Sequence, residues 1–219
     1  MTTLTTDRKL THLLIGAKKH ILVLNVGKTK EMIIDFRRKK PKYKPIMVKG
    51  EAVEQVDKYR YLGLNNKLAW HENTDEIIKI VHSRLFCLRK LGSFRVREDI
   101  LQVFSLSTIS SILTYGCVCW GGNASKQDRD RMEKTIRKAG RVIGRQHETF
   151  ESVYQRRLTD RLMKILSDDT HPLRSEFDSR LIDRCGRLTV PLTKTTRLKH
   201  SFIPKAIQTF NQAHDRHRL

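Results

Sequence analysis

The strongest constraint on the fold is the helical spacing of apolar residues that begins near residue 75. One stripe, in which apolar residues recur every three or four positions, consists of Ile77, Val81, Leu85 and Leu88. This is the pattern of a helix with one buried face. A second helix is expected to open at Ser125, because Asp128 three residues further on resembles a capping signal. A third helix is expected over residues 151–166. Helices should therefore dominate the middle of the chain.

An uncharged stretch lies between the first two of these helices. Residues 100–125 contain no charged side chain, and a stretch of this length is long enough to span a bilayer. Six Ser and Thr residues between positions 105 and 114 dilute its apolar character, and Gly116, Gly121 and Gly122 interrupt its end. We therefore expect a buried helix over residues 98–114, and a membrane is not an expected partner. A membrane span is the alternative.

The first 64 residues combine helical and strand patterns. A short helix is expected over residues 5–19. It should be followed by strands at residues 21–24 and 32–36, joined by a turn that contains Asn and Gly. A second short hairpin is expected within residues 46–56.

Periodicity weakens beyond residue 167, where Gly and Pro interrupt the pattern. We expect a basic, irregular segment there, with a short final helix near residues 205–213. The predicted fold class is therefore α+β and mostly α. Its predicted parts are a mixed region at residues 1–64, a helical region at 65–167 and a basic C-terminal segment at 168–219.

The charge balance indicates the kind of partner. The chain contains 44 Lys and Arg against 23 Asp and Glu, for a net charge of +21. A surplus of this size favours RNA or DNA over a small acidic substrate, because each neutralised phosphate releases counterions. The alternative is solvated charge scattered over the surface.

Clusters of basic residues supply the candidate contacts to nucleic acid. They are Lys28, Lys30, Arg37, Arg38, Lys39, Lys40, Lys42, Lys44, Arg84, Arg89, Lys90, Arg137, Lys138 and Arg141. Four aromatic residues lie near basic runs and are candidates for stacking on bases or sugars. They are Tyr43, Tyr59, Tyr61 and Phe94.

Common catalytic patterns are missing from the sequence. Gly27-Lys28-Thr29 resembles the end of a phosphate-binding loop, but Leu22 stands where that loop requires glycine. The adjacent carboxylates Asp168 and Asp169 could in principle hold two metal ions. Because they close an apolar helix, we expect a solvated helix end instead. No cofactor, metal site or small-molecule substrate is expected.

Cysteine usage and the N-terminal sequence indicate the compartment. The four cysteines are few for this length and lie in or beside apolar or basic runs, which favours reduced thiols. The first residues lack the charged and apolar regions of a signal peptide. We therefore expect an intracellular protein, nuclear or cytoplasmic.

The order of short motifs along the chain resembles the C-terminal part of LINE-type (non-LTR) retrotransposon reverse transcriptases. Residues 24–36 resemble the palm segment that follows the catalytic hairpin, and residues 56–63 resemble the primer grip. Motifs similar to the thumb entry and the region after it follow in the family's order. They lie at residues 68–73, 83–85, 88–91, 93–94, 111–116, 119–123, 136–140, 171–173 and 201–204. Together these motifs cover nearly the whole chain.

This resemblance implies remnant palm β-hairpins at residues 1–64 and a thumb-like helical bundle at 65–167. In that family the metal-binding aspartates lie upstream of the first motif, whereas Asp7 is the only acid before Leu24 here. The resemblance thus implies a nucleic-acid-binding remnant of an RNA-directed DNA polymerase that does not polymerise alone, with RNA, DNA or a hybrid as partner. Tyr61 and Gly63 match residues that would steer a primer terminus, and they join the candidate contacts.

Two alternatives remain open. Residues 20–49 also resemble the small N-terminal domain of AlkB homologue eight, a tRNA-modifying dioxygenase and methyltransferase. That resemblance implies a role in tRNA or nucleic-acid modification, although the sequence contains neither a His-x-Asp pair nor a Gly-x-Gly-x-x-Gly loop. The third possibility is a decayed open reading frame that binds nothing specific.

Overall fold

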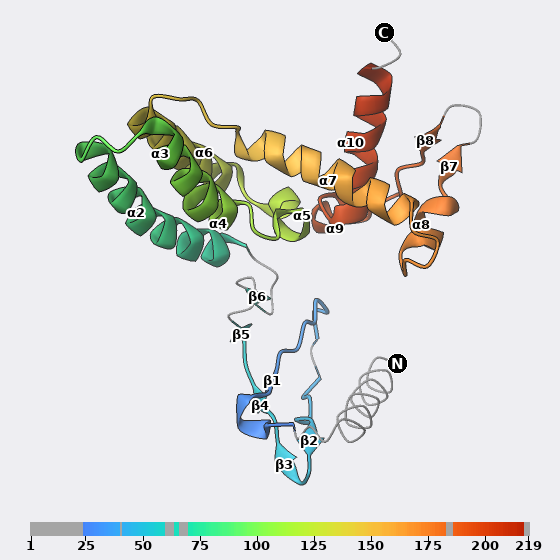
Figure 1. Cartoon of the computed structure of the whole chain (residues 1–219). Coiled ribbons are helices and arrows are strands. Elements are labelled where there is room, and N and C mark those ends of the chain that lie inside the picture. The colour runs from blue at the N-terminus through green and yellow to red at the C-terminus, as the bar shows by residue number, and fades with distance from the viewer. Residues whose placement is uncertain (1–23, 40, 60–63, 66–69, 183–185, 217–219) are drawn as a thin grey trace. The chain divides into compact units, whose positions relative to one another are not determined.

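The computed structural model describes residues 24–39, 41–59, 64–65, 70–182 and 186–216 (Figure 1). The helix expected at residues 5–19 and most of the strand expected at 21–24 lie outside the described residues. The chain divides into two compact units, one ending at Ala69 and the other beginning at Trp70. Residues 168–219 belong to the second unit, together with the helices that precede them.

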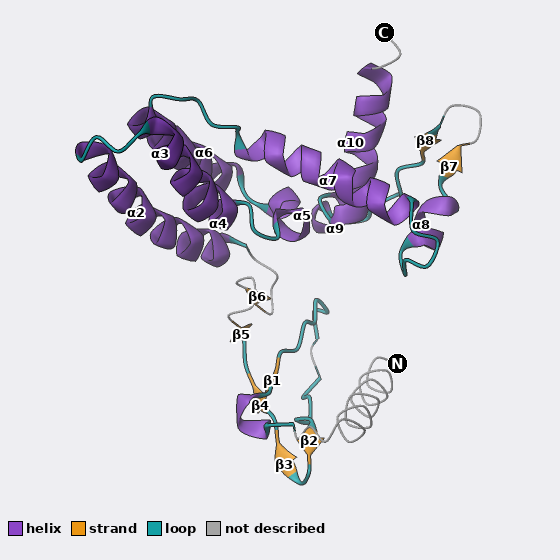
Figure 2. Cartoon of the chain, in the orientation of Figure 1, coloured by secondary structure: helices purple, strands orange, loops and turns teal. Residues whose placement is uncertain are grey.

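The first unit contains short strand pairs (Figure 2). They are a parallel pair of β1 (Lys30–Glu31) with β4 (Glu54–Gln55), and antiparallel pairs of β2 (Met47–Val48) with β3 (Glu51–Ala52) and of β5 (Lys58–Tyr59) with β6 (Leu64–Asn65). The β2–β3 turn places Lys49 and Gly50 at φ 53° and 83°. Two successive positive φ values are typical of a tight hairpin turn. The hairpin predicted within residues 46–56 is confirmed.

The other predicted hairpin differs from the structure. Residues 32–36 form no strand, and the turn residues form a short 3₁₀ helix, η1 (Val26–Lys28). Asn25 caps this helix by accepting a hydrogen bond from the backbone N–H of Lys28 (3.0 Å). An Asn side chain that bonds to the backbone in this way competes with strand pairing. The strand that follows η1 is β1, which is two residues long and pairs with β4.

The second unit is built around two helices, α2 (His71–Ser93) and α6 (Lys126–Ile143), which pack against each other. The predicted stripe of α2 is confirmed except at one position, where Ile78 is buried and the predicted Ile77 is half-buried. The stripe of α2 that is buried comprises Ile78, Val81, Leu85 and Leu88, and that of α6 comprises Met132, Ile136, Ala139 and Ile143. Ser125 caps α6 by accepting a hydrogen bond from the N–H of Asp128 (3.0 Å), as the sequence predicted.

The uncharged stretch forms three successive helical pieces, α3 (Glu98–Ser105), the π-helical turn η2 (Leu106–Ser110) and α4 (Ser111–Leu113). Hydroxyl groups bond back to carbonyls one turn earlier, for example Thr108 to Phe104 (2.7 Å). Such bonds compete with the regular helix ladder and accompany the π-helical turn. The predicted burial holds for one face only. Leu101, Ile109 and Leu113 are buried, whereas Ile100, Val103 and Leu106 are 48–64% exposed.

Within the described residues, the segment Glu98–Asn123 is long and apolar enough to cross a membrane by length and composition alone. A third of its most apolar window is buried inside the fold. The segment continues through α5 (Cys117–Trp120) and the 3₁₀ turn η3 (Gly121–Asn123). The helix expected over residues 98–114 is confirmed as a continuous helical run, Glu98–Leu113, whose middle turn is π-helical.

Aromatic stacking joins this segment to α7 (Phe150–Leu166). The rings of Trp120 and Phe150 stack at 5.5 Å between centroids, and Phe150 stacks on Tyr154 at 6.2 Å. Tyr154, Leu158, Leu162 and Ile165 form the buried stripe of α7. Burial raises the pKa of Tyr154 far above its usual value.

The C-terminal segment is more regular than predicted. It contains α8 (Arg174–Asp178), the pair β7 (Leu181–Ile182) and β8 (Arg187–Leu188), α9 (Thr196–Lys199) and α10 (Phe202–Arg216). Helix α10 packs on α7 and buries Ala206 and Ile207. Asn211 holds β8 through two hydrogen bonds to the backbone of Leu188, at 3.0 and 2.8 Å. The short final helix predicted near residues 205–213 is confirmed as part of α10. The short elements before it were not predicted, because their apolar residues are few and spread out.

A close backbone approach fixes this segment to the rest of the unit. A β-carbon on Gly122 would lie 2.1 Å from the carbonyl oxygen of His200. We expect Gly122→Ala to lower the free energy of unfolding by roughly 1–3 kcal/mol, because backbone must move to accept the methyl group. Hydrogen exchange should become faster in α10. Asn123→Ala is the control, since it removes only a long hydrogen bond to His200 (3.4 Å). Equal effects of the two changes in denaturant melts would contradict this interpretation.

Candidate nucleic-acid interface

Helices α2 and α6 run parallel and side by side. At their N-terminal ends His71 of α2 contacts Asp128 of α6, with 2.9 Å between Nδ1 and Oδ1. At their C-terminal ends a β-carbon on Gly92 would lie 3.2 Å from Cγ1 of Val142. The two helices therefore run in the same direction along their whole contact.

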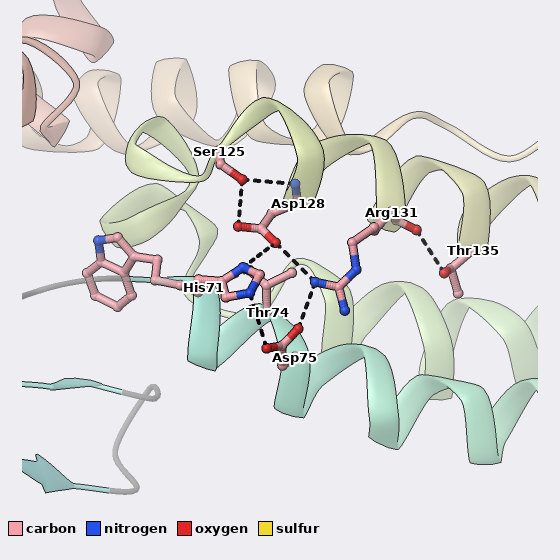
Figure 3. Close-up of polar contacts among 8 residues, drawn as sticks. His71, Thr74, Asp75, Ser125, Asp128, Arg131 and Thr135 are labelled. Atoms are coloured by element: carbon pink, nitrogen blue, oxygen red, sulfur yellow. Dashed lines mark hydrogen bonds and ion pairs between the residues drawn. The ribbon is translucent and has the colours of Figure 1, made fainter.

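A buried carboxylate joins the two N-terminal ends (Figure 3). The Asp128 side chain is only 2% exposed. One oxygen accepts a hydrogen bond from the Ser125 hydroxyl (2.7 Å), and the other contacts His71 (2.9 Å) and Arg131 (3.2 Å). Arg131 also pairs with Asp75 of α2 at 2.7 Å, and this contact raises the pKa of Arg131. A buried charge is tolerated when it is paired and hydrogen-bonded in this way.

The same group is unsuited to nucleophilic catalysis. A catalytic triad requires the imidazole to take the proton of the hydroxyl while the carboxylate orients the imidazole. Here the Ser125 hydroxyl bonds to Asp128 and not to His71. We therefore interpret these residues as a structural link between α2 and α6.

The cations of α6 fall into two sets. Arg129 and Arg131 are used inside the fold: Arg129 donates to the carbonyls of Gly121 and Gly122 (3.0 and 3.1 Å) and pairs with Glu151 (3.1 Å). Among the described residues, no carboxylate pairs with the remaining cations of the helix. They are Lys126, Lys134, Arg137, Lys138 and Arg141.

Arg137 and Arg141 line a hollow over the C-terminal half of α6 and the loop that follows. The other side chains in its lining include Glu133, Arg145, His147 and Thr149. Arg145 is partly neutralised by Glu98 at 3.6 Å. The hollow is therefore positively charged and open to solvent on the side where Arg137 and Arg141 are exposed.

Helix α2 contributes the neighbouring cations. Arg84, Arg89 and Lys90 are exposed, and no carboxylate in the described part of the chain pairs with them. The structure thus brings six of the predicted contacts together on two packed helices: Arg84, Arg89, Lys90, Arg137, Lys138 and Arg141. Lys138 is half-buried and the others are exposed.

The predicted contacts of the first unit are of two kinds. Lys30 pairs with Glu54, and Arg37 pairs with Asp35 and contacts the Tyr43 hydroxyl. The hydrogen bond from Arg37 holds the pKa of Asp35 well below its usual range. The remaining predicted contacts in the described part of this unit are exposed and pair with no described carboxylate: Lys28, Arg38, Lys39, Lys42 and Lys44.

Three predicted contacts, Lys40, Tyr61 and Gly63, lie outside the described residues. Two of the predicted stacking residues are exposed, Tyr59 at 46% and Phe94 at 76%. Tyr43 is half-buried, and its hydroxyl donates to Asp35.

The residues considered for metal binding lie at the end of α7, as expected. Asp168 accepts hydrogen bonds from the backbone and hydroxyl of Thr170 (3.0 and 2.6 Å), and Asp169 pairs with Arg174 at 3.6 Å. In the described ranges, no group of three or more His, Cys, Asp or Glu side chains could hold a metal ion. Cys117 is a buried free thiol whose pKa is raised by burial, whereas Cys119 is exposed.

No protein-family model, curated protein or solved structure matches this chain.

Two residues of this surface are not among the predicted contacts. Phe86 is 59% exposed on α2, and Lys134 extends the row of unpaired cations on α6. A signal for the first was present, because Phe86 lies off the stripe formed by Leu85 and Leu88. The internal use of Arg129 left no sequence signal, since its carbonyl partners belong to a preceding turn.

The link between α2 and α6 can be tested at Asp128. We expect Asp128→Ala to lower the free energy of unfolding by about 2 kcal/mol, because it removes the side-chain partner of the Ser125 cap and leaves Arg131 without its buried partner. Asp130→Ala on the same helix is the control. Asp130 is exposed and should change stability by less than about 0.5 kcal/mol. Similar urea midpoints for the two variants would show that the link is not stabilising.

A second test concerns His147, whose ring is partly buried and whose Nε2 lies 3.2 Å from the Ser105 hydroxyl. Burial lowers the pKa of His147 below its ordinary value of 6.5. As the pH falls through about 6.5, the unfolded chain therefore binds a proton first, and folding stability is lost. We expect the stability of the native sequence to fall between about pH 7.5 and pH 5.5, and His147→Gln to reduce this loss. The exposed His82→Gln serves as control in urea melts at both pH values. If the two variants have the same pH dependence, His147 does not contribute.

Proposed function

We propose that this chain binds nucleic acid through phosphate contacts made by the unpaired cations of α2 and α6. The observation that carries the proposal is their placement. The fold neutralises Arg129 and Arg131 internally but leaves Lys134, Arg137 and Arg141 exposed on a neighbouring face. Exposed cations without a partner among the described carboxylates are free to contact a polyanion.

The arrangement of these cations suits a linear polyanion. Lys134, Arg137 and Arg141 are spaced three or four residues apart, so they form a row along one side of α6, and Lys138 lies beside this row. Arg84, Arg89 and Lys90 lie on the helix packed beside it. Phosphates repeat along a nucleic-acid strand, and a row of cations can contact several of them at once.

The resemblance to the thumb of LINE-type reverse transcriptases supports the same proposal. That region of the family holds nucleic acid and does not itself carry the polymerase metal site. We propose a retrotransposon polymerase origin for the chain, with RNA, DNA or an RNA–DNA hybrid as the partner and no turnover by these helices alone.

The salt dependence of binding tests this function. The variant Arg137→Gln, Lys138→Gln and Arg141→Gln removes three positive charges from α6. We expect weaker binding to a duplex, and a slope of log affinity against log salt that is shallower by about 0.9 for each phosphate that the variant no longer neutralises. Fluorescence anisotropy with a labelled duplex at several salt concentrations measures both quantities.

A charge-matched control is Lys164→Gln, Lys194→Gln and Lys199→Gln. These lysines are exposed and lie outside α2 and α6. If this variant weakens binding as much as the α6 variant does, binding depends on net charge and the proposed interface is wrong. Circular dichroism should show that both variants keep the native helix content.

A further inference from the structure

The outer surface of α2 carries a ridge of aromatic and basic side chains. His82, Phe86 and Lys90 lie on α2, and Phe94 is the residue that caps its C-terminal end. The four are spaced four residues apart, and side chains at this spacing are neighbours along one side of a helix. All four are exposed, Phe86 at 59% and Phe94 at 76%. We call these four residues the α2 ridge.

The ridge is separate from the core. The buried stripe of α2 is Ile78, Val81, Leu85 and Leu88. A single exposed apolar residue on a protein surface is ordinary and needs no ligand to explain it. Two exposed phenylalanines on one ridge, with a lysine between them, require more explanation.

The charge around the ridge is mostly positive. Residues 77–97 contain no Asp or Glu, but they contain Lys79, Arg84, Arg89, Lys90, Arg95 and Arg97. The ammonium group of Lys90 lies 5.9 Å from the centre of the Phe86 ring. A partner for this surface must therefore combine negative charge with flat apolar faces.

Single-stranded nucleic acid has this combination. Its phosphates pair with cations, while its unpaired bases stack on aromatic rings in any sequence context. A helix rises 1.5 Å per residue, so Phe86 and Phe94 lie about 12 Å apart along the axis of α2. Lys90 is placed between them, where it can contact the backbone that joins two stacked bases.

We propose that Phe86 and Phe94 stack on unpaired bases, so that the cationic surface of α2 and α6 binds single-stranded nucleic acid in preference to duplex. This inference rests on the proposed function and adds the class of substrate. An apolar protein partner fits less well, because it would have to supply acidic groups for the cations that flank both rings.

The experiment compares three labelled probes with the full chain. They are an oligothymidylate of about 20 nucleotides, an abasic strand with the same number of phosphates, and a duplex of the same length. We expect the oligothymidylate to bind at least roughly ten times more tightly than the abasic strand.

The test variant is Phe86→Leu with Phe94→Leu, which keeps apolar side chains but removes the aromatic faces. Both positions are exposed, so the fold should tolerate the change. We expect affinity for the oligothymidylate to fall by roughly five-fold or more for each ring, with affinity for the abasic strand unchanged. Ile80→Ala, a change at another exposed apolar residue of α2, should leave both affinities unchanged.

The outcomes separate this inference from the proposed function. Equal binding of the oligothymidylate and the abasic strand by the native chain would overturn stacking but leave phosphate binding intact. Failure to bind any probe would overturn both. If the leucine variant loses self-association in light scattering but keeps its preference for bases, the rings form a contact between copies of the chain and the inference is wrong.

A spectroscopic variant supplies an independent measurement. In Phe86→Trp the new indole would lie on the α2 ridge, and stacking on a base should quench its fluorescence. The native chain, whose tryptophans are Trp70 and Trp120, gives the background quenching for each probe. We expect quenching by the oligothymidylate and little by the abasic strand. Equal quenching by both probes would contradict direct stacking.

Discussion

The packing of α2 against α6 is the contact on which the rest of the second unit depends. The buried stripes of the two helices meet, and the Asp128 carboxylate fixes their N-terminal ends through Ser125, His71 and Arg131. Removing an ion from water is costly, so this carboxylate is stable only with its full set of partners. The link therefore sets both the direction and the register of the two helices, and it decides which of their side chains face solvent.

The register separates structural cations from those available to a ligand. Arg129 points toward the Gly121–Gly122 turn and Arg131 toward α2, where each finds an oxygen partner. The positions further along the helix, including Arg137 and Arg141, have no such partner among the described residues. A basic helix thus serves two purposes on two sides, and the counts of Lys and Arg alone do not distinguish them.

A part of the fold could be predicted where its apolar stripe or capping residue is visible in the local sequence. The helices of residues 71–166 could be predicted, because long apolar stripes and the Ser125 cap are local patterns. The C-terminal segment could not, since Phe177, Leu188 and Ile207 are buried by neighbours distant in sequence. For the interface, the predicted basic clusters contain most of the exposed cations of α2 and α6. The pairing of Lys30 with Glu54 depends on β1–β4 contact and left no sequence signal.

The parallel direction of α2 and α6 has an electrostatic consequence. The dipoles of the two helices point the same way, so partial positive charge gathers at one shared end and partial negative charge at the other. Asp75 and Asp128 lie at the positive end, while Lys90 and Arg141 lie near the negative end. Each helix is thus stabilised by its own end charges. An anionic ligand at the negative end is held by side chains against the opposing field of the backbone, so its affinity depends on guanidinium and ammonium groups and not on helix ends.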